Sequence, residues 1–295
     1  MTRLPDYPVK AAATLIGLLA LTAPGAAQPP ALIDLLVLAG EYVRGFQVDL
    51  ASIIGDEKYR QSVRHIETKE GRDYILTIER TTLSEMLFLW VAEGHGWLAV
   101  RNVLSVDRKP VPDSRSRLER MLADPEPGAV GRFRRLRDES ARFNIGSINR
   151  NFSDPALALQ FVHPSVQPRF DFTLGGREVV DGTATWQIAF AERATPTMIA
   201  IDSRDALSTG MIWVTSSGIV LRTRLAIADP ASRLRLTMEV SHGRDAKLGG
   251  WLPVRMEETY SQTRNGGAVR EQIHCLATYA NYRRFETSAR IVAPK

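Results

Sequence analysis

Glu258 is the residue whose type and position most directly suggest chemistry. Leu252, Val254 and Met256 precede it at every second position, so on a strand its carboxyl group would share their apolar face. A carboxyl group on such a face is costly unless it is paired. Glu258 is therefore either a polar anchor in a cavity or a proton-transfer group with a shifted pKa. A β-bulge or a strand end beside it would instead turn it toward solvent, and the sequence leaves this alternative open.

Cys275 and His274 are a second candidate, because a thiol and an imidazole together can form a nucleophile and its base. Adjacent residues of a strand point to opposite faces, so we expect Cys275 to be a buried structural thiol instead. It is the only cysteine, which excludes an intrachain disulfide. The histidines are not spaced as zinc ligands, and we expect neither a metal site nor a cofactor. They are His65, His95, His163, His242 and His274.

Sequence motifs that mark well-known kinds of active site are absent. The chain contains no Gly-x-Ser-x-Gly, His-Glu-x-x-His or Cys-x-x-Cys segment and no phosphate-binding glycine-rich loop. We therefore predict that the chain is not an enzyme. A hydrolase whose site assembles from distant residues, with Glu258 as its first candidate, is an alternative.

The first residues have the layout of a secretory signal. Arg3 and Lys10 precede an apolar stretch at 11–21, and small residues ending at Ala27 suit a cleavage site. Such a stretch is too short for a membrane span, which needs about 20 apolar residues. We expect a signal peptide at 1–27, cleaved after about Ala27, and a periplasmic or secreted protein.

The charge balance gives little support for a nucleic-acid partner. The chain carries 38 Lys and Arg against 33 Asp and Glu, and loss of residues 1–27 leaves a net charge of about +4 spread over the rest. A local cluster of Arg132, Arg134, Arg135 and Arg137 is typical of a solvated helix face, with contact to anionic lipid headgroups as the alternative. We expect no nucleic acid, at most peripheral membrane contact, and a monomer.

Helical patterns occur in two places. Apolar residues at helical spacing predict a helix over 31–53, and the following Asp56-Glu57 is interpreted as a turn. A proline-rich, charge-dense insert at 109–162 predicts helices over 115–123 and 129–143. A third short helix opens with Asp154 as its N-cap.

The rest of the chain has the pattern of strands. Segments 58–108 and 167–285 alternate apolar with polar residues between turn signals at short intervals. An apolar sheet face must be covered by another sheet, by closure or by helices. We expect a mainly β, α+β fold. It would be a single curved antiparallel sheet or half-barrel of about eleven strands, with a few helices packed in its mouth. A two-sheet β-sandwich is the alternative.

Four segments of the C-terminal half, in this order, resemble the bacterial outer-membrane lipoprotein carrier superfamily. The resemblance covers 165–286, extends to 31–108 only by the order of elements, and does not explain the insert. It implies a single half-open barrel domain over 28–295 with helices plugging its mouth. The segments are 177–182, 210–222, 250–254 and 278–285.

The resemblance also implies a periplasmic binding or carrier module that holds an apolar, lipid-like ligand in a concave cavity. An envelope protein-interaction or sensor module on the same fold is the alternative, with an envelope protein as partner. The residues expected to line the cavity are apolar apart from one carboxyl group, and each could equally be plain core. They are Phe170, Phe172, Trp186, Phe190, Trp213, Leu221, Leu225, Leu236, Met238, Met256 and Glu258.

Overall fold

The computed structural model describes residues 30–50, 53–91, 96–123, 129–150, 153–201 and 203–284. Contacts divide the chain into Met1–Pro30 and Ala31–Lys295, and the description below concerns the second unit. The signal peptide expected at 1–27 and His95 lie outside the described residues. Within the described part, no helix has both the length and the apolar character needed to cross a membrane.

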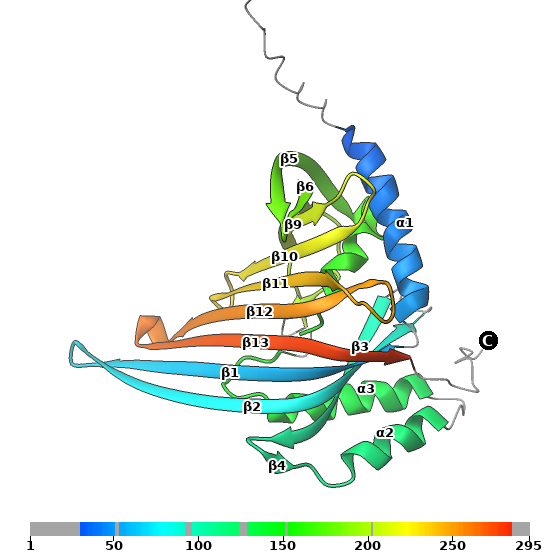
Figure 1. Cartoon of the computed structure of the whole chain (residues 1–295). Coiled ribbons are helices and arrows are strands. Elements are labelled where there is room, and N and C mark those ends of the chain that lie inside the picture. Colours follow the sequence, from blue (N-terminus) through cyan, green and yellow to red (C-terminus); the bar gives the residue numbers. More distant parts are fainter. Residues whose placement is uncertain are drawn as a thin grey trace, which may run out of the picture. The chain divides into compact units, whose positions relative to one another are not determined.

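Strands make up most of the described chain, and the helices fall in the first half (Figure 1). The helices are α1 (Leu32–Leu50), α2 (Ser114–Ala123) and α3 (Ala129–Ser140), with 3-10 turns η2 (Ala141–Phe143), η3 (Leu157–Val162), η4 (Gln167–Arg169) and η5 (Asn265–Gly267). The strands before residue 200 are β1 (Ile53–Lys69), β2 (Arg72–Val91), β3 (Gly96–Val106), β4 (Lys109–Pro110), β5 (Phe170–Val180) and β6 (Thr183–Glu192). The later strands are β7 (Ala200–Ile201), β8 (Arg204–Asp205), β9 (Ser208–Val214), β10 (Val220–Asp229), β11 (Leu234–Arg244), β12 (Trp251–Arg264) and β13 (Val269–Arg284).

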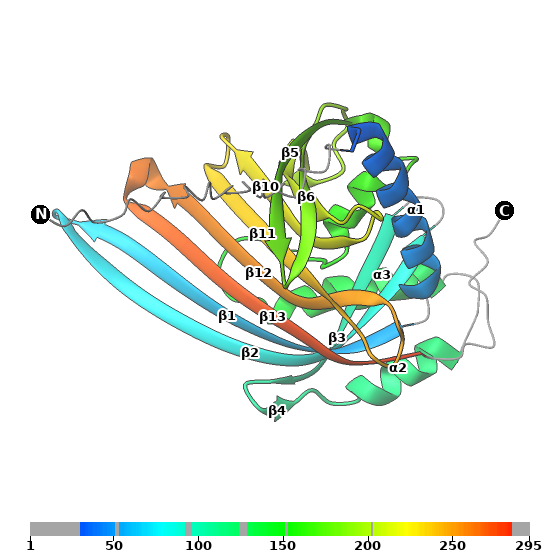
Figure 2. The ribbon, with the colours of Figure 1, turned by 45° about the horizontal axis from the view of Figure 1, so that its top comes forward.

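Eleven of these strands form one antiparallel sheet in the order β4-β3-β2-β1-β13-β12-β11-β10-β9-β6-β5. The last strand, β13, pairs with the first, β1, so the N-terminal meander is joined to the C-terminal one by backbone hydrogen bonds. The sheet is curved and its two edges, β4 and β5, do not pair with each other (Figure 2). The single open sheet confirms the predicted fold class, and the two-sheet alternative is wrong.

The two faces of the sheet bury different clusters. On β2, Met86 and Phe88 belong to the large core, whereas Leu87 and Leu89 belong to a smaller one. Side chains alternate along a strand, so the two clusters lie on opposite faces. We call the face of the large core the inner face and the other the outer face.

The inner face is covered by α1 and η3. One stripe of α1 is buried in the large core, including Leu35, Ala39, Val43 and Phe46. Both figures show α1 running across the sheet beside the ends of β10 to β12 (Figures 1 and 2). The turn before β10 meets it at Gly218, where a side chain would overlap the backbone of α1. The sheet and α1 therefore pack at close range.

The insert supplies cover to both faces. Leu118 of α2 and Phe133 and Leu136 of α3 pack with Leu98 and Val100 in the outer cluster, beside the β3 edge. By contrast, η3 contributes Leu159, Phe161 and Val162 to the inner core. Arg134 and Arg135 of α3 are exposed, as predicted for a solvated helix face.

Two local expectations are wrong. Asp56 and Glu57 do not form a turn after the first helix, because α1 ends at Leu50 and β1 already begins at Ile53. Val254 does not share the face of its neighbours, since it is 39% exposed. The adjacent residues Ser241 and His242 of β11 pair with Arg255 and Pro253 of β12. Val254 is therefore an extra residue in β12, and it breaks the alternation.

Candidate functional site

Eight of the predicted cavity-lining residues come together in the inner core. Six are buried there, and Phe172 and Trp186 are partly buried and packed against it. The eight are Phe170, Phe172, Trp186, Phe190, Leu225, Leu236, Met238 and Met256. Glu258 lies on the same face and is fully buried.

This part of the inner face is filled by side chains. The ring of Phe161 in η3 stacks on Phe170 at 4.7 Å between centroids and meets the edge of Phe190 at 5.3 Å. From the other end, Phe46 of α1 meets His242 of β11 at 6.3 Å. The predicted wall exists, but in this structure it faces α1 and η3.

Trp213 and Leu221 are not with the others. They form a separate cluster with Val180. A register shift between Val220 and Arg222 inserts a residue into β10, so Leu221 turns to the outer face while Val220 stays in the inner core. The alternation predicted for Leu221 is wrong for this reason.

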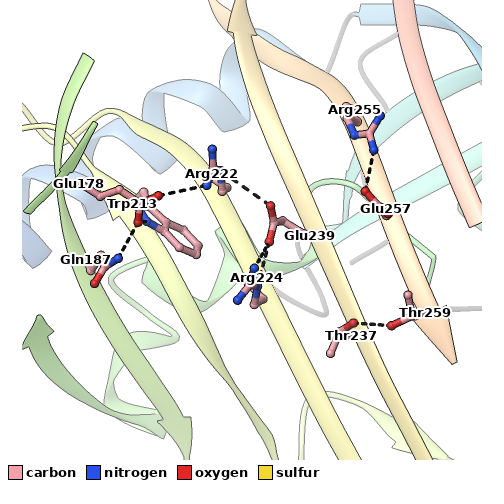
Figure 3. Close-up of polar contacts among 10 residues, drawn as sticks. All are labelled: Glu178, Gln187, Trp213, Arg222, Arg224, Thr237, Glu239, Arg255, Glu257 and Thr259. Carbon is pink, nitrogen blue, oxygen red and sulfur yellow. Dashed lines mark hydrogen bonds and ion pairs between the residues drawn. The ribbon is translucent and has the colours of Figure 1, made fainter. Parts of the chain in front are cut away.

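The outer face around Trp213 carries a polar network (Figure 3). The indole Nε1 donates to Glu178 Oε2 at 2.6 Å, and the guanidinium of Arg222 lies 5.3 Å from the ring centroid. Arg224 Nε donates to Glu239 Oε2 at 2.8 Å on the neighbouring strand. These hydrogen bonds and ion pairs cross from strand to strand, so they tie the sheet together on its solvent side.

Glu258 is an anchor of the inner core. Tyr59 donates to its Oε2 at 2.8 Å and Tyr260 donates to its Oε1 at 2.7 Å. Both carboxylate oxygens therefore have partners, and all three side chains are buried. Burial, with the nearby carboxylate, raises the pKa of both tyrosines, which keeps their hydroxyls protonated as donors. The alternative that a bulge turns Glu258 to solvent is wrong.

Arg150, in the loop between η2 and η3, is buried beside this anchor and is 2% exposed. Its Nη1 donates to Cys275 Sγ at 2.8 Å, and its Nη2 donates to Gln61 Oε1 at 2.7 Å and to the Ile145 carbonyl at 2.8 Å. Burial raises the pKa of Cys275 to about 11, so its thiol is neutral at ordinary pH. The strand neighbour His274 instead contacts Glu257 at 2.8 Å, as expected for residues on opposite faces.

A second buried arginine has a carboxylate partner. Arg101 on β3 donates from Nη2 to Glu57 Oε1 at 2.8 Å and from Nε to Glu57 Oε2. Its guanidinium also lies 4.7 Å from the ring centroid of Tyr59. This two-point ion pair spans β1 and β3 and connects to the Glu258 anchor through Tyr59.

A cavity of about 330 Å³ opens beside the β3 edge of the sheet, where the insert passes from the outer to the inner face. Met86 and Ala99 of the inner core and Leu98 of the outer cluster line it, together with residues of α3, η2 and η3. Its lining combines apolar side chains with charged and hydroxyl groups. It comprises Met86, Leu98, Ala99, Arg101, Arg137, Ser140, Ala141, Asn144, Arg150, Ser153, Asp154, Leu157, Met198, Ile199 and Ala200.

Asp154 is the one carboxyl group among these lining residues. Its Oδ1 accepts a hydrogen bond from the Ala156 backbone at 2.7 Å, close to the N-cap role predicted for it. Burial raises its pKa to about 6, against the lowering effects of this hydrogen bond and of Arg101 and Arg137. Asp154 therefore changes its charge within a physiologically accessible range.

Sequence reasoning missed Arg101 and Arg150 in the lining of this cavity. It also missed Glu57, the ion-pair partner of Arg101. Glu57 continues the inner-face alternation of Tyr59 and Gln61, which was the available signal, but it was assigned to a turn. Arg150 stands in a loop without periodicity, so nothing local marks it as buried. The predicted wall contributes Leu236 to a different groove, of about 410 Å³, across β11 to β13.

Two further features complete the search for chemistry. A groove of about 900 Å³ runs beside α2, lined by residues of both charge signs from β1, β2, β13 and α2, among them Lys58, Glu85, Arg115 and Glu119. Within the described ranges, no group of three or more His, Cys, Asp and Glu side chains is placed to hold a metal ion.

Comparison with known proteins finds solved structures that are similar at low TM-scores and low sequence identity. No family model matches the sequence, and no curated protein matches it. An outer membrane lipoprotein-sorting protein domain from Vibrio parahaemolyticus is similar, at a TM-score of 0.35 and 11% identity over 86% of this chain and 93% of that one. This is the kind of protein that the sequence motifs resemble.

A DUF1329 family protein from Desulfovibrio piger gives a TM-score of 0.29 and 14% identity, over 85% of this chain and 91% of that one. Lipovitellin, in a structure on lipid–protein interactions, gives 0.30 and 7% identity over 82% of this chain but only 26% of its own. Likenesses of this size carry no argument about function, which must come from the site itself.

Proposed function

We propose that the chain is a binding or carrier module, without a catalytic step of its own, that holds an apolar, lipid-like ligand on the inner face of its sheet. The observation that carries this proposal is the cavity of about 330 Å³ between β2, β3 and the α3–η3 segment. Ligand pockets commonly begin at about this size and combine apolar walls with a few polar groups.

The construction of the inner face supports the same reading. Its cover consists of α1 and η3, which are not strands of the sheet, so a shift of either leaves the strand pairing in place. A ligand longer than the cavity would then meet the wall formed by Leu225, Met238 and their neighbours. Met86 and Met198 already line the cavity, and methionine adapts to varied ligand shapes.

The test is binding of decan-1-ol by the purified protein, measured by displacement of a fluorescent apolar probe, with native mass spectrometry of gently extracted protein. Ala99→Phe places a ring into the cavity and is expected to weaken decan-1-ol binding at least tenfold. Ala184→Phe, on an exposed strand position, is the matched control and should leave it unchanged. Protein that carries no lipid and binds no decan-1-ol would refute the proposal.

A hydrolase centred on Glu258 is less well supported. Both of its oxygens accept hydrogen bonds from tyrosine hydroxyls, so neither is free to take a proton from a substrate. Glu258→Gln is expected to lower the free energy of unfolding by about 1–3 kcal/mol, because one of the two buried acceptor oxygens becomes an amide donor that faces a tyrosine hydroxyl. Ligand retention should be unchanged, and loss of a measurable turnover in this variant would restore the enzymatic reading.

For location, we propose export to the periplasm or beyond. The support is the order of charged, apolar and small residues at 1–27. Cell fractionation and N-terminal sequencing of the mature protein test this, and a mature chain that still begins at Met1 in the cytoplasm would overturn it.

A further inference from the structure

Arg150 is a buried cation whose direct partners are all neutral. They are a thiol, a side-chain amide and a backbone carbonyl, from Cys275, Gln61 and Ile145. Within the described part of the chain, no carboxylate forms an ion pair with it. Burial acts to lower the pKa of Arg150, but neighbouring groups, the charge of Glu258 among them, raise it overall. Glu258 does not form an ion pair with Arg150, because its two oxygens accept from tyrosines. A buried charge without a paired counter-charge is costly, so such a group calls for an anion.

The cavity beside Arg150 has an excess of positive charge. Three arginines line it, Arg101, Arg137 and Arg150, against the single carboxyl group of Asp154. Arg101 is paired with Glu57, and Arg137 contacts Asp138 at 2.8 Å. Arg150 is thus the lining arginine that lacks an acidic partner among the described residues.

Hydrogen-bond donors at this place are also unused. Nε of Arg150 and Oγ of Ser153 are buried and have no hydrogen-bond partner among the described residues. Both residues line the cavity, but these two atoms are covered by their neighbours, so an acceptor in the cavity reaches them only when the side chains turn toward it. Buried donors are nearly always satisfied in folded proteins, so two orphans beside one cavity indicate a missing acceptor.

We propose that this cavity receives the oxyanion of an amphiphilic ligand, a carboxylate or a phosphate monoester, beside Arg150 and Ser153, an assignment that rests on the proposed binding function. The oxyanion supplies the acceptor that the two donors lack and the negative charge that Arg150 lacks. The apolar tail lies along the apolar lining residues, such as Met86, Leu157 and Ile199. A neutral amphiphile fills the same apolar space but leaves the charge unpaired.

The first experiment uses the unmodified protein at pH 7 and three probes with the same tail: decanoate, decyl phosphate and decan-1-ol. We expect one of the two anions to bind at least tenfold more tightly than the alcohol, and the better anion identifies the headgroup. Equal affinity for anion and alcohol would overturn this inference while the proposed function stands. Binding of none of the three would refute both.

Two variants then test the named residues. Arg150→Gln should lower the ratio of anion affinity to decan-1-ol affinity to about one, while decan-1-ol still binds. Arg134→Gln, on the exposed side of α3, is the matched control and should leave this ratio unchanged. If Arg150→Gln does not fold, the affinities of the same probes are measured in Asp154→Asn.

This substitution removes the only carboxyl group of the lining, so it should tighten anion binding several-fold at pH 7 and leave decan-1-ol binding unchanged. An unchanged anion affinity in Asp154→Asn would contradict the assignment.

Discussion

Two buried groups should make the stability of this protein depend on pH in opposite directions. Burial raises the pKa of Asp154 from 3.8 to about 6, so the folded chain takes up this proton before the unfolded chain does. The folded state is therefore stabilised as pH falls through 6. Burial lowers the pKa of His242 from 6.5 to about 4, so the unfolded chain is protonated first. The folded state is destabilised as pH falls below 6.5.

The two effects are nearly equal. Between pH 7 and pH 4.5, these pKa differences give a gain of about 2 kcal/mol from Asp154. Over the same range they give a loss of about 2 kcal/mol from His242. In the parent protein the two contributions offset each other, so neither is visible alone.

Single substitutions separate them. Asp154→Asn keeps an acceptor for the Ala156 backbone but cannot titrate, so its free energy of unfolding should fall by about 2 kcal/mol more than that of the parent between pH 7 and pH 4.5. His242→Phe keeps an aromatic ring against Phe46, and its free energy of unfolding should fall by about 2 kcal/mol less than that of the parent over that range. Urea titrations followed by tryptophan fluorescence at both pH values give these differences.

Comparison of each variant with the parent removes the contribution of every other titrating group. The double variant should return to the parent's pH dependence, because the two sites act independently. The change in the free energy of unfolding between pH 7 and pH 4.5 could instead match that of the parent within about 0.5 kcal/mol in both single variants. This result would show that the two side chains are not buried as described.

Three further substitutions test the packing. Gly210→Ala would push a methyl group into the carbonyl of Arg224 on the paired strand, so thermal unfolding should show a loss of about 2 kcal/mol or more. Gly218→Ala strains a backbone with φ +86° and crowds Leu38, so hydrogen exchange in α1 should accelerate. Leu76 is 58% exposed and lies on the part of β2 that extends past β3, where the strand edge is unpaired. A charge on such an edge opposes pairing with a second molecule, so Leu76→Lys should reduce self-association in light scattering without loss of stability.

The architecture was predictable because it depends on patterns that recur along the chain. Alternation of period two fixed most strands, and the helical stripe of α1 fixed the cover of the inner face. The pattern failed at Leu221 and Val254, next to register shifts in β10 and between β11 and β12. A bulge inserts one residue without changing the apolar composition, so the sequence around it gives no sign of the displaced face.

The site was predictable only in part, because its contacts join distant residues. An inward Glu258 followed from local alternation, but its partner Tyr59 is 199 positions away and arrives through the pairing of β1 with β13. Glu57 was misassigned because the Gly55-Asp56 pair before it has the composition of a turn, which outweighed its alternation with Tyr59 and Gln61. The burial of Arg150 depends on the path of the loop between η2 and η3, which has no periodic pattern that the sequence could reveal.

Apolar residues alone could not locate the proposed binding site, because a packed core and a cavity wall have the same composition. The filled region around Phe170 and Phe190 and the open region around Leu157 both contain apolar residues of the inner core. Both regions also hold buried charge, but Glu192 beside Phe170 has Arg169 and Ser208 as partners, whereas Arg150 at the cavity has no ion pair among the described residues. Two unused donors, an unpaired cation and a titratable carboxyl group at one cavity are better explained by a bound anion than by packing. The position of charge within the apolar interior is therefore the most informative guide to function in this chain.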